Sequence, residues 1–188
     1  MTPGELSALR RGDAVAVDAF YRDHARLVLG WVIRLGGPRL DAEDVAHEVF
    51  ETALRRLGDY RGDASPATWL YAITRRIVAN ARRKVWVKRV FGLDTGPEPS
   101  APAVADQHGV RREVQTVLEA LSVQHREVLV LLLMEERPAA EVAEMLGVPV
   151  GTVYSRAHHA RRLFAEAFAA SDLAGAPRDN VVQLGRGP

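Results

Sequence analysis

Apolar residues recur at intervals of three and four along most of this chain, and this spacing constrains the fold more than any other feature. One such segment runs from Val17 to Leu35 and ends at Gly36-Gly37-Pro38, and a second runs from Val45 to Leu57. Intervals of three and four place side chains on one face of an α-helix, whereas a half-buried strand alternates strictly. No segment shows convincing alternation of that kind. The sequence therefore predicts an all-α protein.

One stretch interrupts the helical pattern. Residues 92–109, GLDTGPEPSAPAVADQHG, are rich in Pro, Gly, Ala and Ser, which is the composition of an extended linker. Helical periodicity then resumes at Val110. We therefore predict two small helical domains, at residues 10–91 and 110–170, joined by a flexible linker at 92–109. Residues 171–188 lack a clear pattern and are predicted to form a disordered tail.

The C-terminal domain is predicted to contain a helix-turn-helix. A short helical segment, AAEVAEML, is followed by Gly147-Val148-Pro149 and then by VGTVYSRAHHARRLF, which is the sequence form of that unit. On a helical wheel, Val153, Ala157 and Ala160 share a narrow apolar face. The opposite face and its shoulders carry polar and basic residues: Tyr154, Ser155, Arg156, His158, His159, Arg161 and Arg162. Such side chains can bond phosphates and base edges in a major groove.

The basic cluster has three other interpretations, which are a metal site, a solvated surface and a site for an acidic protein. A zinc pair on a helix needs two histidines at positions i and i+4. His158 and His159 are adjacent and point about 100° apart on a helix, so a metal site is not predicted. An ordinary solvated basic face and an acidic protein partner both stay open from this helix alone.

The N-terminal domain separates its charges along the chain. Five acids lie close together between positions 41 and 51, and Asp44, Glu48 and Glu51 share one helix face. Between Ala64 and Leu93 there is no acid at all, although seven arginines and lysines occur there. Either segment alone could be a solvated surface. Opposite signs on successive helices suggest two different partners.

Composition and missing motifs argue against several other functions. Without cysteine the chain has no disulfide framework and no thiolate metal site. No apolar run approaches the roughly 18 residues of a membrane span, and the first residues lack the apolar region of a signal peptide. No Gly-rich phosphate loop, Gly-x-Ser-x-Gly or His-Glu-x-x-His motif occurs. We therefore predict a cytoplasmic protein that is not an enzyme and has no cofactor.

Three segments, taken in this order, resemble those of bacterial alternative sigma factors of the extracytoplasmic-function (ECF) type, in the sigma-70 family. DAEDVAHEVFETALRRL (Asp41–Leu57) is similar to the helix that docks on the clamp coiled coil of the RNA polymerase beta-prime subunit. YRGDASPATWLYAITRRIVANARRK (Tyr60–Lys84) is similar to the region that melts and recognises the minus-ten element. EVAEMLGVPVGTVYSRAHHARRLF (Glu141–Phe164) is similar to the helix-turn-helix that reads the minus-thirty-five element.

The resemblance implies roles for particular residues. Those implied to bind core polymerase are Asp41, Asp44, His47, Glu48 and Glu51. Those implied to contact minus-ten DNA are Tyr60, Arg61, Asp63, Ser65, Trp69, Arg75, Arg76, Arg82, Arg83 and Lys84. Those implied to contact minus-thirty-five DNA are Thr152, Tyr154, Ser155, Arg156, His158, His159 and Arg162. For Trp69 a core role is at least as consistent with the sequence. The linker would thread the polymerase channel towards the RNA exit path.

Four positions depart from the family pattern. His47 replaces a usual Gln, Arg76 a common Asn, Tyr154 a usual Lys or Arg, and His159 a usual Arg. These departures leave the implied mechanism intact and put the promoter sequence in doubt.

The resemblance implies an alternative sigma factor that binds core RNA polymerase and directs promoter-specific initiation. Its partners would be core polymerase, promoter DNA and an anti-sigma factor, which could hold the chain at the membrane. One alternative is a helix-turn-helix regulator that binds DNA without polymerase. Another is an interaction protein whose basic helix meets an acidic partner.

Overall fold

The computed structural model describes residues 1–91 and 108–170, with side chains in the second range from Val114 onward. Every regular element in these ranges is helical, which confirms the all-α prediction. The chain divides into two compact units, unit 1 at residues 1–100 and unit 2 at residues 101–188. Nearly all of the predicted linker and the whole predicted tail lie outside the described residues.

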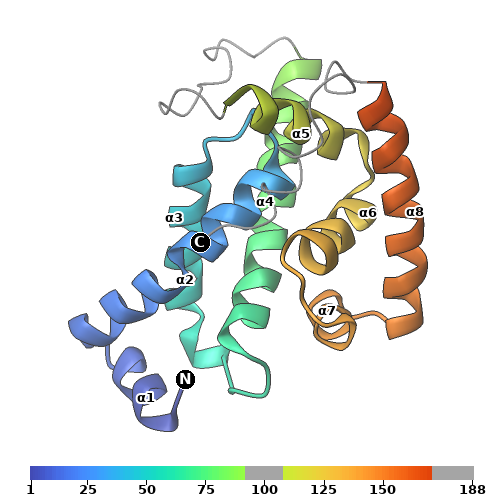
Figure 1. The fold of residues 1–188 in the computed structure, drawn as a ribbon. Coiled ribbons are helices and arrows are strands. Elements are labelled where there is room, and N and C mark those ends of the chain that lie inside the picture. The colour runs from blue at the N-terminus through green and yellow to red at the C-terminus, as the bar shows by residue number, and fades with distance from the viewer. Residues whose placement is uncertain (92–107, 171–188) are drawn as a thin grey trace. The chain divides into compact units, whose positions relative to one another are not determined.

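Unit 1 is a small bundle in which the chain turns back on itself between long helices (Figure 1). Its elements are α1 (Pro3–Arg10), α2 (Ala14–Gly36), α3 (Ala42–Arg55), a 3-10 turn η1 (Leu57–Asp59) and α4 (Pro66–Val90). Helices α2, α3 and α4 all pack on one another, and α1 packs on α2. Helix α1 was not predicted from the sequence.

Side-chain caps start the three main helices of unit 1. The Asp13 carboxylate accepts a hydrogen bond from the amide of Ala16 at 2.9 Å, so α2 begins directly after it. Asp41 begins α3 and Ser65 begins α4 in the same way. Such caps satisfy amides that have no partner inside the helix.

Large aromatic side chains fill the core of unit 1. Trp31 and Tyr71 are completely buried, and their rings meet edge to face with centroids 5.1 Å apart. Phe20 meets Phe50 in the same manner at 6.4 Å. Edge-to-face contacts suit the ring quadrupoles and stabilise such pairs by about 1 kcal/mol beyond the burial of apolar area. This core fixes α4 against α2, and it leaves the outer faces of α3 and α4 exposed.

Unit 2 contains the predicted helix-turn-helix. Its elements are α5 (His108–Ala120), α6 (Val123–Val128), a π-helical turn η2 (Leu129–Met134), α7 (Ala139–Leu146) and α8 (Val150–Ala169). Helix α8 packs on α5, α6, η2 and α7. Between α7 and α8, Gly147 takes a left-handed conformation with φ 65°, which costs other residues a steric penalty.

The core of unit 2 includes the apolar run Val128–Leu131, which is buried throughout. Leu118, Leu121, Leu129 and Ala160 form one buried cluster. Arg126 lies beside this core, is only 1% exposed, and donates to the carbonyl oxygens of Glu119 at 3.0 Å and Leu121 at 3.2 Å. A buried cation therefore satisfies carbonyls at the end of α5 that the helix leaves without partners.

Candidate nucleic-acid interface

The predicted acidic face lies on the outside of α3. Asp44, His47, Glu48 and Glu51 are all exposed. Asp41 is also exposed, but its carboxylate accepts hydrogen bonds from the amides of Glu43 at 3.1 Å and Asp44 at 3.0 Å. The fold thus brings four of the five predicted residues onto one helical surface. The fifth, Asp41, caps the start of the same helix.

The loop between η1 and α4 is closed by a hydrogen bond between two of its own residues. We call residues 60–65 the 60–65 loop. The Tyr60 hydroxyl donates to the carbonyl oxygen of Ala64 at 2.6 Å, and Gly62 takes φ 86°, a conformation that glycine adopts without strain. Arg61 and Asp63 remain exposed at the tip. The loop therefore has a defined shape that presents two charged side chains.

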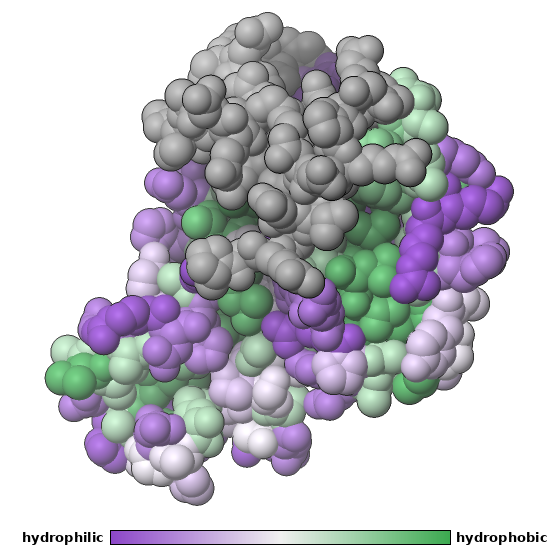
Figure 2. All heavy atoms as spheres, viewed as in Figure 1, coloured by the Kyte–Doolittle hydropathy of each residue, from purple (hydrophilic) through white to green (hydrophobic). Residues whose placement is uncertain are grey.

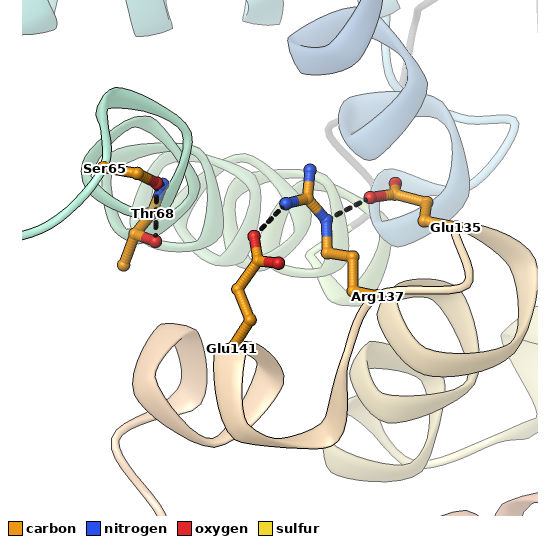
Figure 3. A network of polar contacts seen from close by, with 5 residues as sticks. All are labelled: Ser65, Thr68, Glu135, Arg137 and Glu141. Carbon is orange, nitrogen blue, oxygen red and sulfur yellow. Dashed lines mark hydrogen bonds and ion pairs between the residues drawn. The ribbon is translucent and has the colours of Figure 1, made fainter. Parts of the chain in front are cut away.

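Ser65 and Thr68 fix the end of this loop to α4 (Figure 3). The Ser65 hydroxyl oxygen accepts from the amide of Thr68 at 3.1 Å and lies 3.0 Å from the Thr68 hydroxyl. Ser65 was predicted to contact DNA, and in the structure its hydroxyl serves as the helix cap.

Tyr60 is interior, although the sequence placed it in a polar loop. It is only 5% exposed, and its ring lies on Trp69 with centroids 4.9 Å apart. Burial raises the pKa of the Tyr60 phenol, and the nearby carboxylate of Asp63 raises it further. Trp69 is half-buried, and its ring packs on that of Tyr60. The buried Tyr60 therefore supports the loop from the interior, and Trp69 lies partly at the surface beside the loop.

The basic face of α4 begins just beyond Trp69. Arg75, Arg76, Arg83 and Lys84 are exposed. Arg82 differs, because it is half-buried and donates from Nη1 to the carbonyl oxygen of Leu35 at 2.9 Å. Four of the five predicted cations therefore lie on the surface, and the fifth ties α4 to the end of α2.

Helix α8 presents the predicted recognition surface. Val153, Ala157 and Ala160 are buried at 0–1% exposure, while Ser155, His158, His159 and Arg162 are exposed. Tyr154 is 61% exposed, so its ring is available to a ligand on this face. In the view of Figure 2, hydrophilic side chains gather along the outer edge of α8. The inner stripe thus fixes the helix, and the outer face is open to a ligand.

Some of the predicted α8 residues also make contacts within the helix. The Ser155 hydroxyl donates to the carbonyl oxygen of Thr152 at 3.1 Å, and Thr152 itself is half-buried. Arg162 forms an exposed ion pair with Glu166 at 3.2 Å. Exposed pairs one helical turn apart contribute only about 0.3–0.5 kcal/mol. That small stabilisation leaves Arg162 able to exchange its partner for a phosphate or a base.

Three histidines lie close together in unit 2. The ring centroids of His158 and His159 are 5.8 Å apart, and those of His125 and His159 are 6.2 Å apart. Within residues 1–91 and 108–170, no group of three or more His, Cys, Asp or Glu side chains is arranged to hold a metal ion.

A second polar network supports the entry to α7. Arg137 donates from Nε to Glu135 at 2.9 Å and from Nη1 to Glu141, and Figure 3 shows the guanidinium between the two carboxylates. Burial lowers the pKa of Arg137, but the two carboxylates outweigh burial and raise it overall. These contacts fix the turn before α7, so they support the helix-turn-helix from within.

Two arginines that bond main-chain carbonyls were not predicted from the sequence. Arg10 donates to the carbonyl oxygen of Tyr60 at 2.5 Å from 50 residues away, and Arg126 is buried beneath α5. No local pattern reveals either contact, because both depend on how the helices pack. Over the described helices, none is long and apolar enough to cross a membrane.

Both units of the chain are similar to known proteins. Residues 20–87 match the family model for sigma-70 region 2, and residues 111–164 match that for sigma-70 region 4. The chain is 30% identical over 161 residues to the ECF RNA polymerase sigma factor SigL of Mycobacterium tuberculosis, covering 84% of this chain and 91% of that relative.

Two solved structures share the fold. One is CnrH in complex with the cytosolic domain of CnrY, with TM-score 0.66 and 22% identity over 89% of this chain and 97% of that chain. The other is the sigma factor RpoE in complex with the anti-sigma factor NepR from Bartonella quintana. It has TM-score 0.62 and 22% identity over 80% of this chain and 98% of that chain.

Proposed function

Since this chain belongs to the ECF sigma factors of the sigma-70 family, we propose that its exposed surfaces divide the work of promoter recognition. The chain is an alternative sigma factor, which binds core RNA polymerase and promoter DNA and directs promoter-specific initiation. Its family favours this function over that of a helix-turn-helix regulator that acts without polymerase. One observation supports this proposal: charged side chains are exposed on three separate surfaces. These surfaces lie on α3, on α4 with the 60–65 loop, and on α8.

The acidic face of α3 is the proposed dock for the clamp coiled coil of the polymerase beta-prime subunit. Asp44 and Glu48 lie one turn apart and are exposed, and Glu51 extends the same line. A row of carboxylates steers a basic partner and fixes its register. His47 stands at the edge of this row and supplies a hydrogen-bonding side chain. Asp41 contributes by starting the helix.

The 60–65 loop and the basic face of α4 are proposed to melt and hold the minus-ten element. Extruding a base from a duplex costs a few kcal/mol, which a fitted pocket and a stacking surface can offset. The loop tip offers Arg61 and Asp63 for hydrogen bonds to such a base, and the half-buried Trp69 is the proposed stacking surface. Arg76, Arg83 and Lys84 would hold the phosphates, so affinity should fall as salt rises.

Helix α8 is the proposed reader of the minus-thirty-five element. Its exposed arginine, histidine and serine side chains project where a recognition helix meets base edges. Tyr154 and His159 are the departures from the family pattern on this face. Tyr154 presents an apolar ring that could contact the methyl group of thymine, and His159 could accept as well as donate a hydrogen bond. We therefore expect these two side chains to shift base preference.

We propose that an anti-sigma factor regulates this chain. The sigma factor RpoE, which shares the fold, was solved in complex with the anti-sigma factor NepR. We further propose that the chain works in the cytoplasm and that a membrane-anchored anti-sigma factor could hold it there. No catalytic group or cofactor is needed for this function, because polymerase supplies the chemistry.

The loop's part in this proposal is tested by a matched pair of acid substitutions. The full chain with core polymerase would be bound to a promoter mapped from its own transcripts. Unpaired thymines in the minus-ten element would then be detected by permanganate. We expect Asp63→Ala to reduce melting roughly tenfold, the effect of one lost contact to a base, while binding to the closed promoter is unchanged. Asp59→Ala is the control, because Asp59 is exposed next to the loop and pairs with Arg56 at 3.1 Å.

Equal melting by the Asp63→Ala variant and the wild-type chain would remove Asp63 from the proposed site. Equal losses in the two variants would mean that charge near the loop matters and that a specific contact does not.

A further inference from the structure

Helix α1 lies outside the family match, which begins at residue 20, yet it contacts the candidate site. Arg10, at its last position, donates from Nη2 to the carbonyl oxygen of Tyr60 at 2.5 Å. This bond joins segments that are 50 residues apart in the chain and is partly buried. The neighbouring Arg11 points elsewhere and donates to the hydroxyl of Ser7 at 2.8 Å.

The structure of α1 holds Arg10 in place. A reciprocal capping box starts the helix, with the Thr2 hydroxyl accepting from the Glu5 amide at 3.2 Å and Glu5 accepting from the Thr2 amide at 2.6 Å. At the other end, Leu9 is only 3% exposed and anchors the helix in unit 1. A capped, anchored helix restricts the arginine beside Leu9 to a small set of positions.

Tyr60 links this helix to the 60–65 loop. Its carbonyl accepts from Arg10, its hydroxyl donates to the Ala64 carbonyl at 2.6 Å, and its ring contacts Trp69. The amide of Tyr60 donates to the Leu57 carbonyl at 3.3 Å. Every polar group of this residue is therefore used to fix the start or the end of the loop, and the exposed tip remains for a ligand.

We infer that Arg10 is a positioning residue, which through the Tyr60 carbonyl holds the 60–65 loop in the shape that receives the unpaired base. This inference rests on the proposed function of the loop. A loop that is already in its binding shape loses less conformational freedom when the base enters. Small misplacements of positioned groups can slow a reaction by about a hundredfold. The loss of one of several anchors should have a smaller effect, on the order of tenfold.

The test combines a protein change with a DNA change. The full chain and core polymerase would open a promoter that carries a fluorescent base analogue in the minus-ten element, and the opening rate would be followed. An abasic site is then placed at each position of this element in turn. The position at which it lowers the opening rate of the wild-type chain most identifies the captured base. Arg10→Ala is compared with the wild-type chain on the intact promoter and on the promoter that is abasic at that position. Arg11→Ala is the matched control.

If Arg10 positions the loop, Arg10→Ala slows opening about tenfold on the intact promoter and less than about twofold on the abasic one, because coupled changes are not additive. Affinity for core polymerase is unchanged, and Arg11→Ala behaves as the wild-type chain does. Arg10→Lys keeps a cationic donor and recovers part of the rate, which separates lost positioning from poor folding.

Equal slowing on both promoters would overturn the inference, as would equal effects of Arg10→Ala and Arg11→Ala. Suppose that the wild-type chain is sensitive to an abasic site at one position, and that the Arg10→Ala chain opens the intact promoter at the wild-type rate. That result would overturn the inference about Arg10 and leave the loop's proposed function standing. A wild-type chain with no such position would overturn the loop's proposed function as well.

Discussion

The 60–65 loop of unit 1 and helix α8 of unit 2 present polar side chains in two different ways. The loop is held by side chains that bond to main-chain carbonyls, including Arg10 on Tyr60 and Tyr60 on Ala64. In helix α8, burial of Val153, Ala157 and Ala160 fixes the helix and leaves its polar face outward. A protein that receives an unpaired base needs a shaped recess, whereas one that reads a duplex needs a straight, open face. The shaped loop and the open helix face therefore suit the tasks that we propose for them.

The largest expected effect concerns the proposed docking on polymerase through α3, on which the use of both surfaces depends. We expect Asp44→Arg combined with Glu48→Arg to weaken binding to core polymerase by about a thousandfold, because like charges facing each other cost several kcal/mol. Binding would be measured by fluorescence anisotropy with labelled chain. Asp18→Arg combined with Asp23→Arg, two exposed acids of α2, is the control. Unchanged core binding by the first variant would mean that the docking face is elsewhere.

The next effect tests whether α8 reads bases. We expect Arg162→Ala to weaken binding to the minus-thirty-five element by about 1–3 kcal/mol if the guanidinium contacts a base. The measurement is the affinity of the chain with core polymerase for promoters that differ at single positions. Glu166→Ala removes the ion-pair partner of Arg162 and leaves the arginine. If both variants lose the same affinity, the pair acts only within the helix, and Arg162 belongs to the solvated face.

The smallest effect tests whether hydrogen bonds fix the 60–65 loop. We expect Tyr60→Phe to lower the free energy of unfolding by about 1 kcal/mol, the usual contribution of one hydrogen bond. Chemical unfolding of the full chain, followed by circular dichroism, measures this. Tyr21→Phe is the control, because Tyr21 is 42% exposed. Equal stability of the Tyr60→Phe and wild-type chains would show that the ring alone holds the loop.

The same variant has a signature in pH. The pKa of Tyr60 is raised in the folded chain, first by burial and then by Asp63. The folded state therefore keeps a proton that the unfolded state loses above pH about 10. The contribution of this tyrosine to stability is complete below that pH and is lost as the pH rises through the folded value. The Tyr60→Phe variant should therefore lose less free energy of unfolding than the wild-type chain as the pH rises above about 10, which chemical unfolding at several pH values would measure.

The sequence predicted most of α8 correctly because one helix carries the whole pattern. Its apolar stripe and its polar face are both local, and the Gly-containing turn before it is a strong signal. The same holds for α3, where the acids recur on one face. Local periodicity was sufficient for these elements.

The parts that could not be predicted depend on contacts between distant segments. Arg82 reads as a surface cation, and the structure binds it to the carbonyl of Leu35. Tyr60 reads as a loop residue, and packing against Trp69 buries it. Helix α1 is different, because Thr2, Pro3 and Glu5 already form a recognisable helix start. That capping box predicts a helix at the position of α1, but it does not predict the contact between α1 and the loop.

The most direct test of the account is run-off transcription with purified core polymerase on a library of genomic fragments, with and without this chain. We predict transcripts from discrete start sites only when both are present, with shared sequences upstream at the minus-ten and minus-thirty-five positions. The Asp44→Arg and Glu48→Arg double variant should yield none of them. The absence of any chain-dependent transcript, or equal transcription by the double variant, would contradict the account.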